Sequence, residues 1–295
     1  MLSPAATHAV PGVRIRTRAA WTVLIGLAGL GSVIVLLIAA FLAAEAAPLI
    51  QQVGMGTFLL DTEWWPRDGS YGMGTMVLAS LLLTVGAVLF AAPVGWALAV
   101  QHTFFLGARG RLLVGKLVEG SASIPTVVFG LWGVGSIVPM VGQWRPPGAS
   151  LLAGMLVVAV MILPTVTLMM MEAFQATSHS MLQAAESLGV SRTHAVVHLV
   201  TPAARSGLLA ALILGAARAI GETMVVLMVC GNIPQVPSSV TDPVRTLTAN
   251  IALEMPYAMG AHRSALFVAG LLILLLVGVL VLLRDALPLM ARRRP

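Results

Sequence analysis

Uncharged, apolar runs limit the folds open to this chain more than any other feature. Five of them contain 26, 40, 25, 26 and 20 residues without Asp, Glu, Lys or Arg. In order, they lie between Arg18 and Glu45, Asp68 and Arg109, Glu119 and Arg145, Arg145 and Glu172, and from Ser264 to Leu283. Because a helix needs about 20 apolar residues to cross a bilayer, the runs predict an all-α integral membrane protein.

The composition excludes several other classes of protein. Only 9% of the 295 residues are charged and 58% are hydrophobic, whereas a soluble globular protein carries about 25% charged residues. The net charge of +6 suits anionic lipid headgroups or an anionic cargo, and there is too little charge to coat nucleic acid. Cys230 is the one cysteine, so no intramolecular disulfide can form.

A sixth apolar stretch, about 207–231, differs from the others because Arg218 and Glu222 interrupt it. Six transmembrane helices are therefore predicted, one of them with charge at mid-depth. The alternative for the first run is a signal peptide, since arginines precede it and Ala44-Glu45-Ala46 resembles a cleavage site. Its apolar run is longer than the roughly 7–15 residues of a signal core, which favours a retained anchor.

The basic residues predict the orientation. With a cytoplasmic N-terminus, twelve fall on the inner side, namely Arg14, Arg16, Arg18, Arg109, Arg111, Lys116, Arg192, Arg205, Arg284, Arg292, Arg293 and Arg294. Four fall on the outer side, namely Arg67, Arg145, Arg245 and Arg263. This bias places both termini in the cytoplasm.

The predicted organisation has four parts. A cytoplasmic N-terminal arm spans 1–18, and the first helix with its outer loop spans 19–72. The transmembrane domain spans 73–284 and contains an inner connection at about 173–206. A basic cytoplasmic tail, 285–295, ends the chain.

The inner connection has the pattern of a docking element. Gln183-Ala184-Ala185 is followed by Gly189 and then by Leu199 and Pro202. An apolar stripe at helical spacing predicts a short helix that ends near Gly189; it consists of Met181, Leu182, Ala184, Ala185 and Leu188. The spacing resembles the EAA loop of type-I ABC importer permeases, with Gln183 in place of Glu. Resemblance implies that this loop docks on a cytoplasmic ATPase; the alternative is a small helix that caps the bundle.

Arg218 and Glu222 suggest an anion pathway. An arginine at the centre of a span costs about 2.5–3.5 kcal/mol or more, so it normally faces a cavity or a partner. The spacing of four residues predicts that both side chains share one helix face, and an intrahelical ion pair is the structural alternative. A guanidinium fork matches two oxygens of a tetrahedral oxyanion. We expect Glu222 to orient Arg218 and to accept a hydrogen bond from a protonated phosphate, which sulfate cannot donate.

The residues around this pair resemble one family of permeases. The run from Gly215 to Met224, followed by Met228 to Asn232, is similar to the permeases of phosphate-specific ABC importers, and specifically to their C-type subunit. Three further stretches agree, namely 65–72, 123–130 and 161–165. The resemblance to this family covers about residues 60–280.

The resemblance implies a function and a set of partners. The chain would be one permease of a multi-pass complex in the bacterial inner membrane, paired with an A-type permease subunit. Arg218, Glu222 and Thr223 would lie on the phosphate path. A homodimeric ATPase, which uses ATP and Mg, would drive transport, and an extracytoplasmic phosphate-binding protein would deliver cargo. The chain itself would be no enzyme and would bind no cofactor.

Other functional signals are weaker. Gly110 to Lys116 fits the first part of a nucleotide P-loop, but Leu117 replaces the Ser or Thr that binds Mg²⁺. His179, His194 and His198 lack a carboxylate or Cys to complete a metal site.

Three alternative functions remain open. The chain could be a permease for sulfate, molybdate or a phosphonate, a standalone secondary transporter, or a membrane scaffold. Neighbouring genes for an ATPase and a secreted binding protein would favour the importer.

Overall fold

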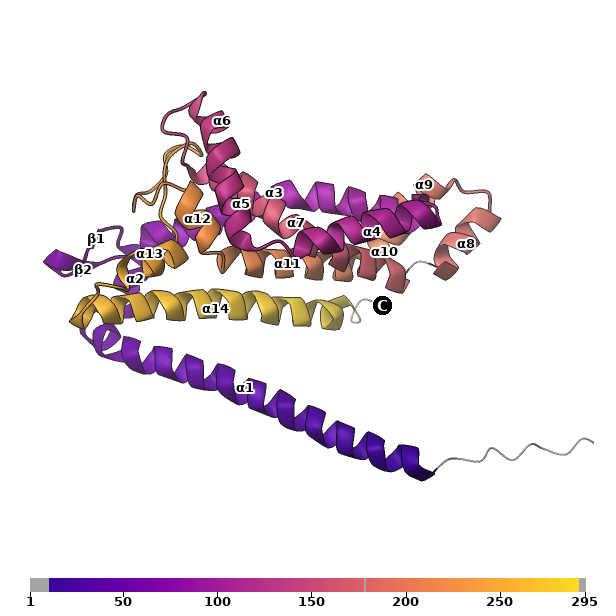
Figure 1. Ribbon diagram of the computed structural model, residues 1–295, viewed down its shortest axis with the longest axis horizontal. Coiled ribbons are helices and arrows are strands. Elements are labelled where there is room, and N and C mark those ends of the chain that lie inside the picture. Colours follow the sequence, from indigo (N-terminus) through magenta and orange to yellow (C-terminus); the bar gives the residue numbers. More distant parts are fainter. Residues whose placement is uncertain (1–10, 178, 292–295) are drawn as a thin grey trace, which may run out of the picture.

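Long helices run side by side along one axis of the molecule (Figure 1). The computed structural model describes residues 11–177 and 179–291. Four helices define the long axis: α1 (Pro11–Val53), α3 (Gly74–Val100), α7 (Leu151–Thr177) and α14 (Gly260–Ala291). The uncharged runs form the middle of these helices, and α1, α7 and α14 extend past the runs to include charged residues such as Glu45, Glu172 and Arg284.

The helices confirm an all-α protein with several membrane spans. Within the described residues, four helical segments are long and apolar enough to cross a membrane, and the number rises to six if each of two bent helix pairs is one span. The total of six therefore depends on the bent pairs and stays a prediction.

The first bent pair corrects the predicted third span. Instead of one helix over 120–144, the chain forms α4 (Ala108–Ala122) and α5 (Thr126–Trp132), and the two directions differ by 90°. Pro125 explains the break, because it has no amide proton to donate and disfavours helical backbone at Ile124. A π-helical turn (Gly133–Ile137) and α6 (Val138–Gly142) follow.

The fifth span is also broken. Helix α11 (Arg205–Ile220) ends beyond Arg218, and α12 (Met224–Val229) starts after the three-residue break 221–223. The expectation that Arg218 and Glu222 share one helix face is wrong, because the helix ends between them. No ion pair joins these two side chains among the described residues within 4.0 Å.

The inner connection is helical, as predicted. It consists of α8 (His179–Ser187), α9 (Arg192–Ala195), a π-helical turn (Val196–Val200) and α10 (Thr201–Ala203). The segment Arg192–Ala203 and α11 form the second bent pair, and their directions differ by 70°. Pro202 lies inside a backbone that is helical from 192 to 203, where its missing amide proton leaves one helical hydrogen bond unmade.

Two hydrophobic cores hold the helices together. The larger core lies between α3, α7, α11 and α12. The smaller core joins the end of α1, α2 (Met55–Leu60), a two-stranded antiparallel hairpin of β1 (Trp64–Trp65) and β2 (Ser70–Tyr71), α13 (Leu247–Glu254) and the start of α14.

A cluster of polar side chains stabilises the smaller core. Arg245 Nη1 donates to Glu254 Oε1 at 2.6 Å, and Trp64 Nε1 donates to Oε2 of the same carboxylate at 3.0 Å. His262 Nε2 lies 2.8 Å from Oε2. The cluster thereby ties the hairpin, the loop before α13 and the start of α14 to one carboxylate.

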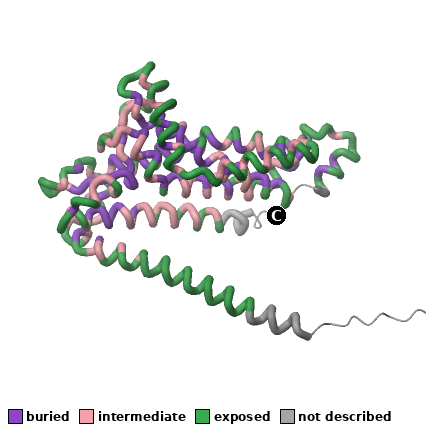
Figure 2. The backbone as a smooth tube through the Cα atoms, viewed as in Figure 1, coloured by how far each residue is buried: buried purple, intermediate pink, exposed green. Residues whose placement is uncertain are grey.

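Most of the described part of α1 is exposed along its length (Figure 2). An apolar helix with an open surface is stable in lipid, where no water penalises the exposed side chains. The start of α1, the end of α14 and α8 lie at the same end of the long axis (Figure 1). Which side of the membrane this end faces stays a prediction. The division of the chain into four parts also stays a prediction. Residues 1–10 and the arginines at 292–294 lie outside the described residues.

Candidate functional site

Arg218 lies in the last turn of α11, just before the break. Its Nη1 donates a hydrogen bond to Thr165 Oγ1 of α7 at 2.5 Å. A guanidinium has five N–H donors, and among the described residues this is the one hydrogen bond recorded for the group. The side chain is half-buried. Arg218 is thus held on one side and keeps donors for a further oxygen-rich group.

Close helix packing sets the position of Arg218. A Cβ on Gly215, one turn earlier in α11, would lie 2.6 Å from Val166 Cγ2 of α7. The missing side chain therefore lets α11 approach α7 beside Thr165, in the way small residues bring membrane helices together. The distance between Arg218 and Thr165 depends on this approach.

Glu222 lies in the break and points to α12. Its Oε1 accepts a hydrogen bond from the amide of Val225 at 3.2 Å, and its backbone oxygen accepts one from the hydroxyl of Thr248 at 2.7 Å. The residue is 8% exposed. It therefore stabilises the start of α12 instead of orienting Arg218. Among the described residues no hydrogen bond to Oε2 is recorded, so this oxygen remains available.

Thr223 follows in the same break. Its hydroxyl donates to the backbone oxygen of Gly221 at 3.3 Å, and its side chain is half-buried. The structure thus places Arg218, Glu222 and Thr223 around one interruption of the fifth helix. Their contact with an anion stays a prediction.

Gly189 ends α8 in a Schellman motif. The amide of Val190 donates to the backbone oxygen of Ala185 at 3.1 Å, and the amide of Gly189 donates to that of Glu186 at 3.0 Å. Gly189 has φ +78°, a backbone conformation that favours glycine. The predicted helix stop is therefore confirmed.

The apolar stripe of α8 divides into two faces. Leu182 and Ala185 are buried in the larger core, whereas Met181, Ala184 and Leu188 are exposed. The exposed three are spaced i, i+3 and i+7, so they form one open apolar face. Gln183, Leu199 and Pro202 are also exposed. A face of this kind has the features of a contact surface for another protein.

Some residues of the site were missed by the sequence reasoning. The stretch 161–165 resembles the family, but nothing in its sequence identifies Thr165 as the partner of Arg218. The helix-capping role of Glu222 was missed because the break was not predicted. A glycine followed by Glu and Thr is a usable signal for such a break, since Glu at a helix start accepts amide protons.

The weaker signals have ordinary structural settings. Gly110 to Lys116 lies inside α4, so its backbone is helical and cannot form a phosphate-cradling loop. The rings of His194 and His198 are stacked with centroids 4.1 Å apart. Within the described residues, no group of three or more His, Cys, Asp or Glu side chains is placed to hold a metal ion.

The fold and the broken fifth helix define a class, the multi-pass membrane permeases, and comparisons with known proteins give the family. Residues 91–288 match the model of the binding-protein-dependent transport system inner membrane component. The chain belongs to this family and is the permease subunit of an ABC importer.

Individual relatives agree with the family assignment. The probable ABC transporter permease protein YqgH of Bacillus subtilis is 32% identical over 92% of this chain and 85% of its own length. The phosphate transport system permease protein PstC of Haemophilus influenzae is 28% identical over 77% of this chain and 79% of its own. The predicted resemblance to C-type phosphate permeases is thus confirmed.

Solved structures support the fold. A structure of the inward-facing MetNI methionine ABC transporter covers 72% of this chain and 93% of its own, with 19% identity and a TM-score of 0.56. A second crystal form of the same transporter gives 16% identity and a TM-score of 0.55. At this identity the likeness concerns the fold alone.

Proposed function

We propose that this chain is a permease subunit of an ATP-driven importer of inorganic phosphate. The observation that carries the proposal is Arg218, which is anchored to Thr165 by one donor while its other donors bond no group in the part of the chain that the structure describes. A guanidinium that stays protonated and offers paired N–H groups suits a tetrahedral oxyanion. The names of relatives such as PstC of Haemophilus influenzae support phosphate as this anion.

Glu222 contributes selectivity in this proposal. Its Oε2 accepts no hydrogen bond from residues 11–177 or 179–291, and Glu222 lies in the same break as Thr223. A carboxylate oxygen accepts a hydrogen bond from a protonated phosphate, whereas it repels sulfate, which carries no proton at neutral pH. The path would therefore admit phosphate and discriminate against sulfate.

The exposed apolar face of α8 transmits the conformational change of the ATPase to the membrane helices. Met181, Ala184 and Leu188 form the contact, Ala185 and Gly189 fix the end of the helix, and the segment of Leu199 and Pro202 links it to α11. The partners are an A-type permease, a homodimeric ATPase that uses ATP and Mg, and an extracytoplasmic phosphate-binding protein. Because α11 carries Arg218, a movement of α8 can make the anion bind more strongly in one of the outward-facing and inward-facing states than in the other. Alternating access requires such a difference in binding.

Uptake into vesicles that contain the complete transporter tests the cargo. We expect radiolabelled phosphate to accumulate only with ATP, and a large excess of sulfate, molybdate or a phosphonate to leave this uptake unchanged. Accumulation of one of those anions in place of phosphate would support a permease for that oxyanion. Accumulation by the chain without the ATPase would require a standalone secondary transporter and would overturn the proposal.

A further inference from the structure

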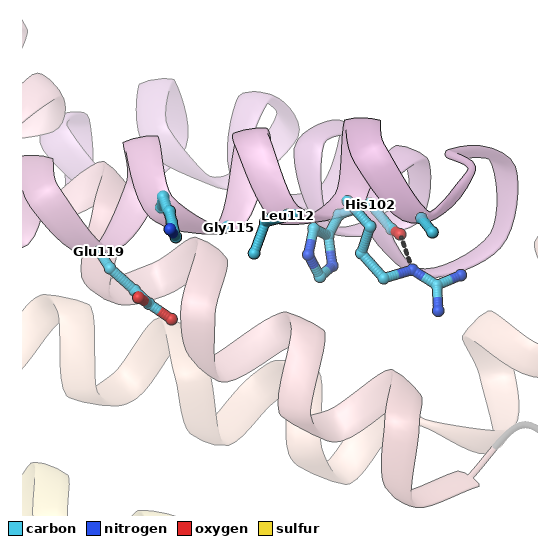
Figure 3. Close-up of a pocket in the computed structure, with 7 residues that line it drawn as sticks. His102, Leu112, Gly115 and Glu119 are labelled. Carbon is cyan, nitrogen blue, oxygen red and sulfur yellow. Dashed lines mark hydrogen bonds between the residues drawn. The ribbon is translucent and has the colours of Figure 1, made fainter.

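A cavity lined by both apolar and charged side chains lies on α4, and Arg218 is not among its lining residues. It has a volume of about 470 Å³ and is lined by His102, Ala108, Arg111, Leu112, Gly115, Lys116 and Glu119 (Figure 3). Apart from His102, these residues lie along one face of α4. His102 comes from the π-helical turn Gln101–Phe105 at the end of α3. Helix α4 runs toward the end of the molecule where α8 and α9 lie (Figure 1).

His102 is buried with unused hydrogen-bonding capacity. The residue is 8% exposed, and its Nδ1 has no hydrogen-bond partner among the residues that the structure describes. A Cβ on Gly115 would lie 3.4 Å from Nε2, so the missing side chain leaves the ring next to the cavity. A buried polar ring of this kind costs free energy unless a further group bonds it.

The cavity is rich in donors for an anion. Arg111 donates to the backbone oxygens of His102 and Thr103 at 3.2 Å each, which fixes its guanidinium at the rim. Lys116 forms no ion pair within 4.0 Å in the part of the chain that the structure describes. The first amides of a helix lack intrahelical acceptors, and Ala108, the first residue of α4, lines the cavity.

Glu119 at the far end restricts which anion fits. A carboxylate repels a group that brings only negative oxygens, and it attracts one that also brings a proton or a cation. A protonated phosphate meets this condition, and so does a phospholipid headgroup with an ammonium or hydroxyl group. Leu112 in the wall and the exposed Leu113 and Leu117 beside it offer apolar contact for acyl chains.

We infer that this cavity binds a phosphate group at the His102 end of α4, with Arg111 and Lys116 as its charged contacts. The source of the group is either free inorganic phosphate or the headgroup of a phospholipid. The inference does not depend on the proposed cargo, because none of the lining residues belongs to α11 or to the break that carries Glu222 and Thr223.

Binding measurements on the purified full chain with its permease and ATPase partners, without the phosphate-binding protein, test the site. The variant Lys116→Gln removes a charge from the cavity, and Gly115→Leu fills it without a change in charge. The matched control is Arg109→Gln, which removes a charge from the same helix outside the cavity. Radiolabelled phosphate binding is measured in an Arg218→Gln background, so that the proposed transport site contributes nothing. Retention of phosphatidylglycerol and phosphatidylethanolamine is measured in parallel by native mass spectrometry.

We expect one of the two ligands to bind about tenfold more weakly to the Lys116→Gln and Gly115→Leu variants, and less than about twofold more weakly to the control. Loss of inorganic phosphate identifies a free anion, and loss of lipid identifies a headgroup. Equal losses in the Arg109→Gln control would indicate diffuse attraction to a basic helix and would overturn the site. Unchanged binding of both ligands in both cavity variants would overturn it as well.

Discussion

Arg218 of α11 donates a hydrogen bond to Thr165 of α7 at 2.5 Å, and not to Glu222, which lies four residues further along the chain. The helix break at 221–223 separates the two charges, and Glu222 turns to the start of α12. Arg218 is therefore positioned by a neutral hydroxyl, and no carboxylate of the described residues lies within 4.0 Å to compensate its charge. An uncompensated guanidinium inside a membrane protein is costly unless it faces water or an anion.

The variant Glu222→Gln separates the two roles of this residue. The amide oxygen of Gln can still accept the Val225 amide proton, so we expect α12 to remain in place. Loss of the negative charge should let sulfate compete with phosphate uptake about tenfold better, because a like-charge contact no longer excludes it. Phosphate uptake with increasing sulfate is the measurement. A variant that rejects sulfate as well as wild type would refute the selectivity role.

The variant Ala184→Arg tests the exposed face of α8. A large charged side chain there should prevent close docking, so we expect the ATPase recovered with the purified chain to fall by about tenfold or more. Glu186→Lys is the control, because it also adds a basic side chain to α8 and breaks only an exposed ion pair with Arg192 at 3.7 Å. If both variants retain the ATPase, this face is not its docking site.

The variant Gly215→Ala tests the packing that positions Arg218. Its new Cβ would lie 2.6 Å from Val166 Cγ2, and such overpacking costs about 1–3 kcal/mol of unfolding free energy. We expect lower stability in mixed micelles together with reduced phosphate uptake. Gly278→Ala in α14 is the matched control, since its Cβ would meet nothing within 4 Å. Similar stability for the two variants would contradict the proposed close approach.

The hydrogen bonds of Asp242 predict that the loop around it, which lies outside the helices, is destabilised by acid. The hydroxyl of Ser238, together with the amide of Ser239, holds the pKa of this carboxyl below its ordinary value of 3.8. Because the folded pKa is the lower one, the carboxylate stabilises the loop fully above about pH 3.8, and this contribution is lost as the pH falls below that value.

Hydrogen exchange of the Ser238 and Ser239 amides measures this effect, after correction for the intrinsic pH dependence. We expect protection in wild type to decrease as the pH falls through this range. Protection in an Asp242→Asn variant should be lower at neutral pH and should change little with acid. A wild-type loop with the same protection at acidic and neutral pH would contradict the assignment.

The sequence predicts the class of fold and the docking element better than it predicts the breaks. Uncharged runs locate the long helices because lipid requires apolar side chains over the whole span. Gly189 ends α8 as predicted because its signal is local, a glycine in a left-handed conformation. The bend at Pro125 follows from a proline, but its 90° angle does not, since tertiary packing decides how far a helix turns.

The immediate surroundings of Arg218 were beyond sequence reasoning. The break after α11 contains no proline, so spacing alone favoured a continuous helix with Glu222 on the same face. The contact with Thr165 joins residues 53 positions apart, and it depends on how closely α7 and α11 approach. Side chains that a sequence places near one another need not meet when the backbone between them leaves the helix.

Phosphate uptake by the complete transporter, with Arg218→Gln compared with Arg218→Lys and wild type, tests the central claim most directly. We expect Arg218→Gln to abolish uptake while the ATPase still co-purifies, and Arg218→Lys to restore only part of it, because a lysine keeps the charge but not the paired donors. Full uptake by Arg218→Gln would show that the arginine is structural and would contradict an anion path at the end of α11.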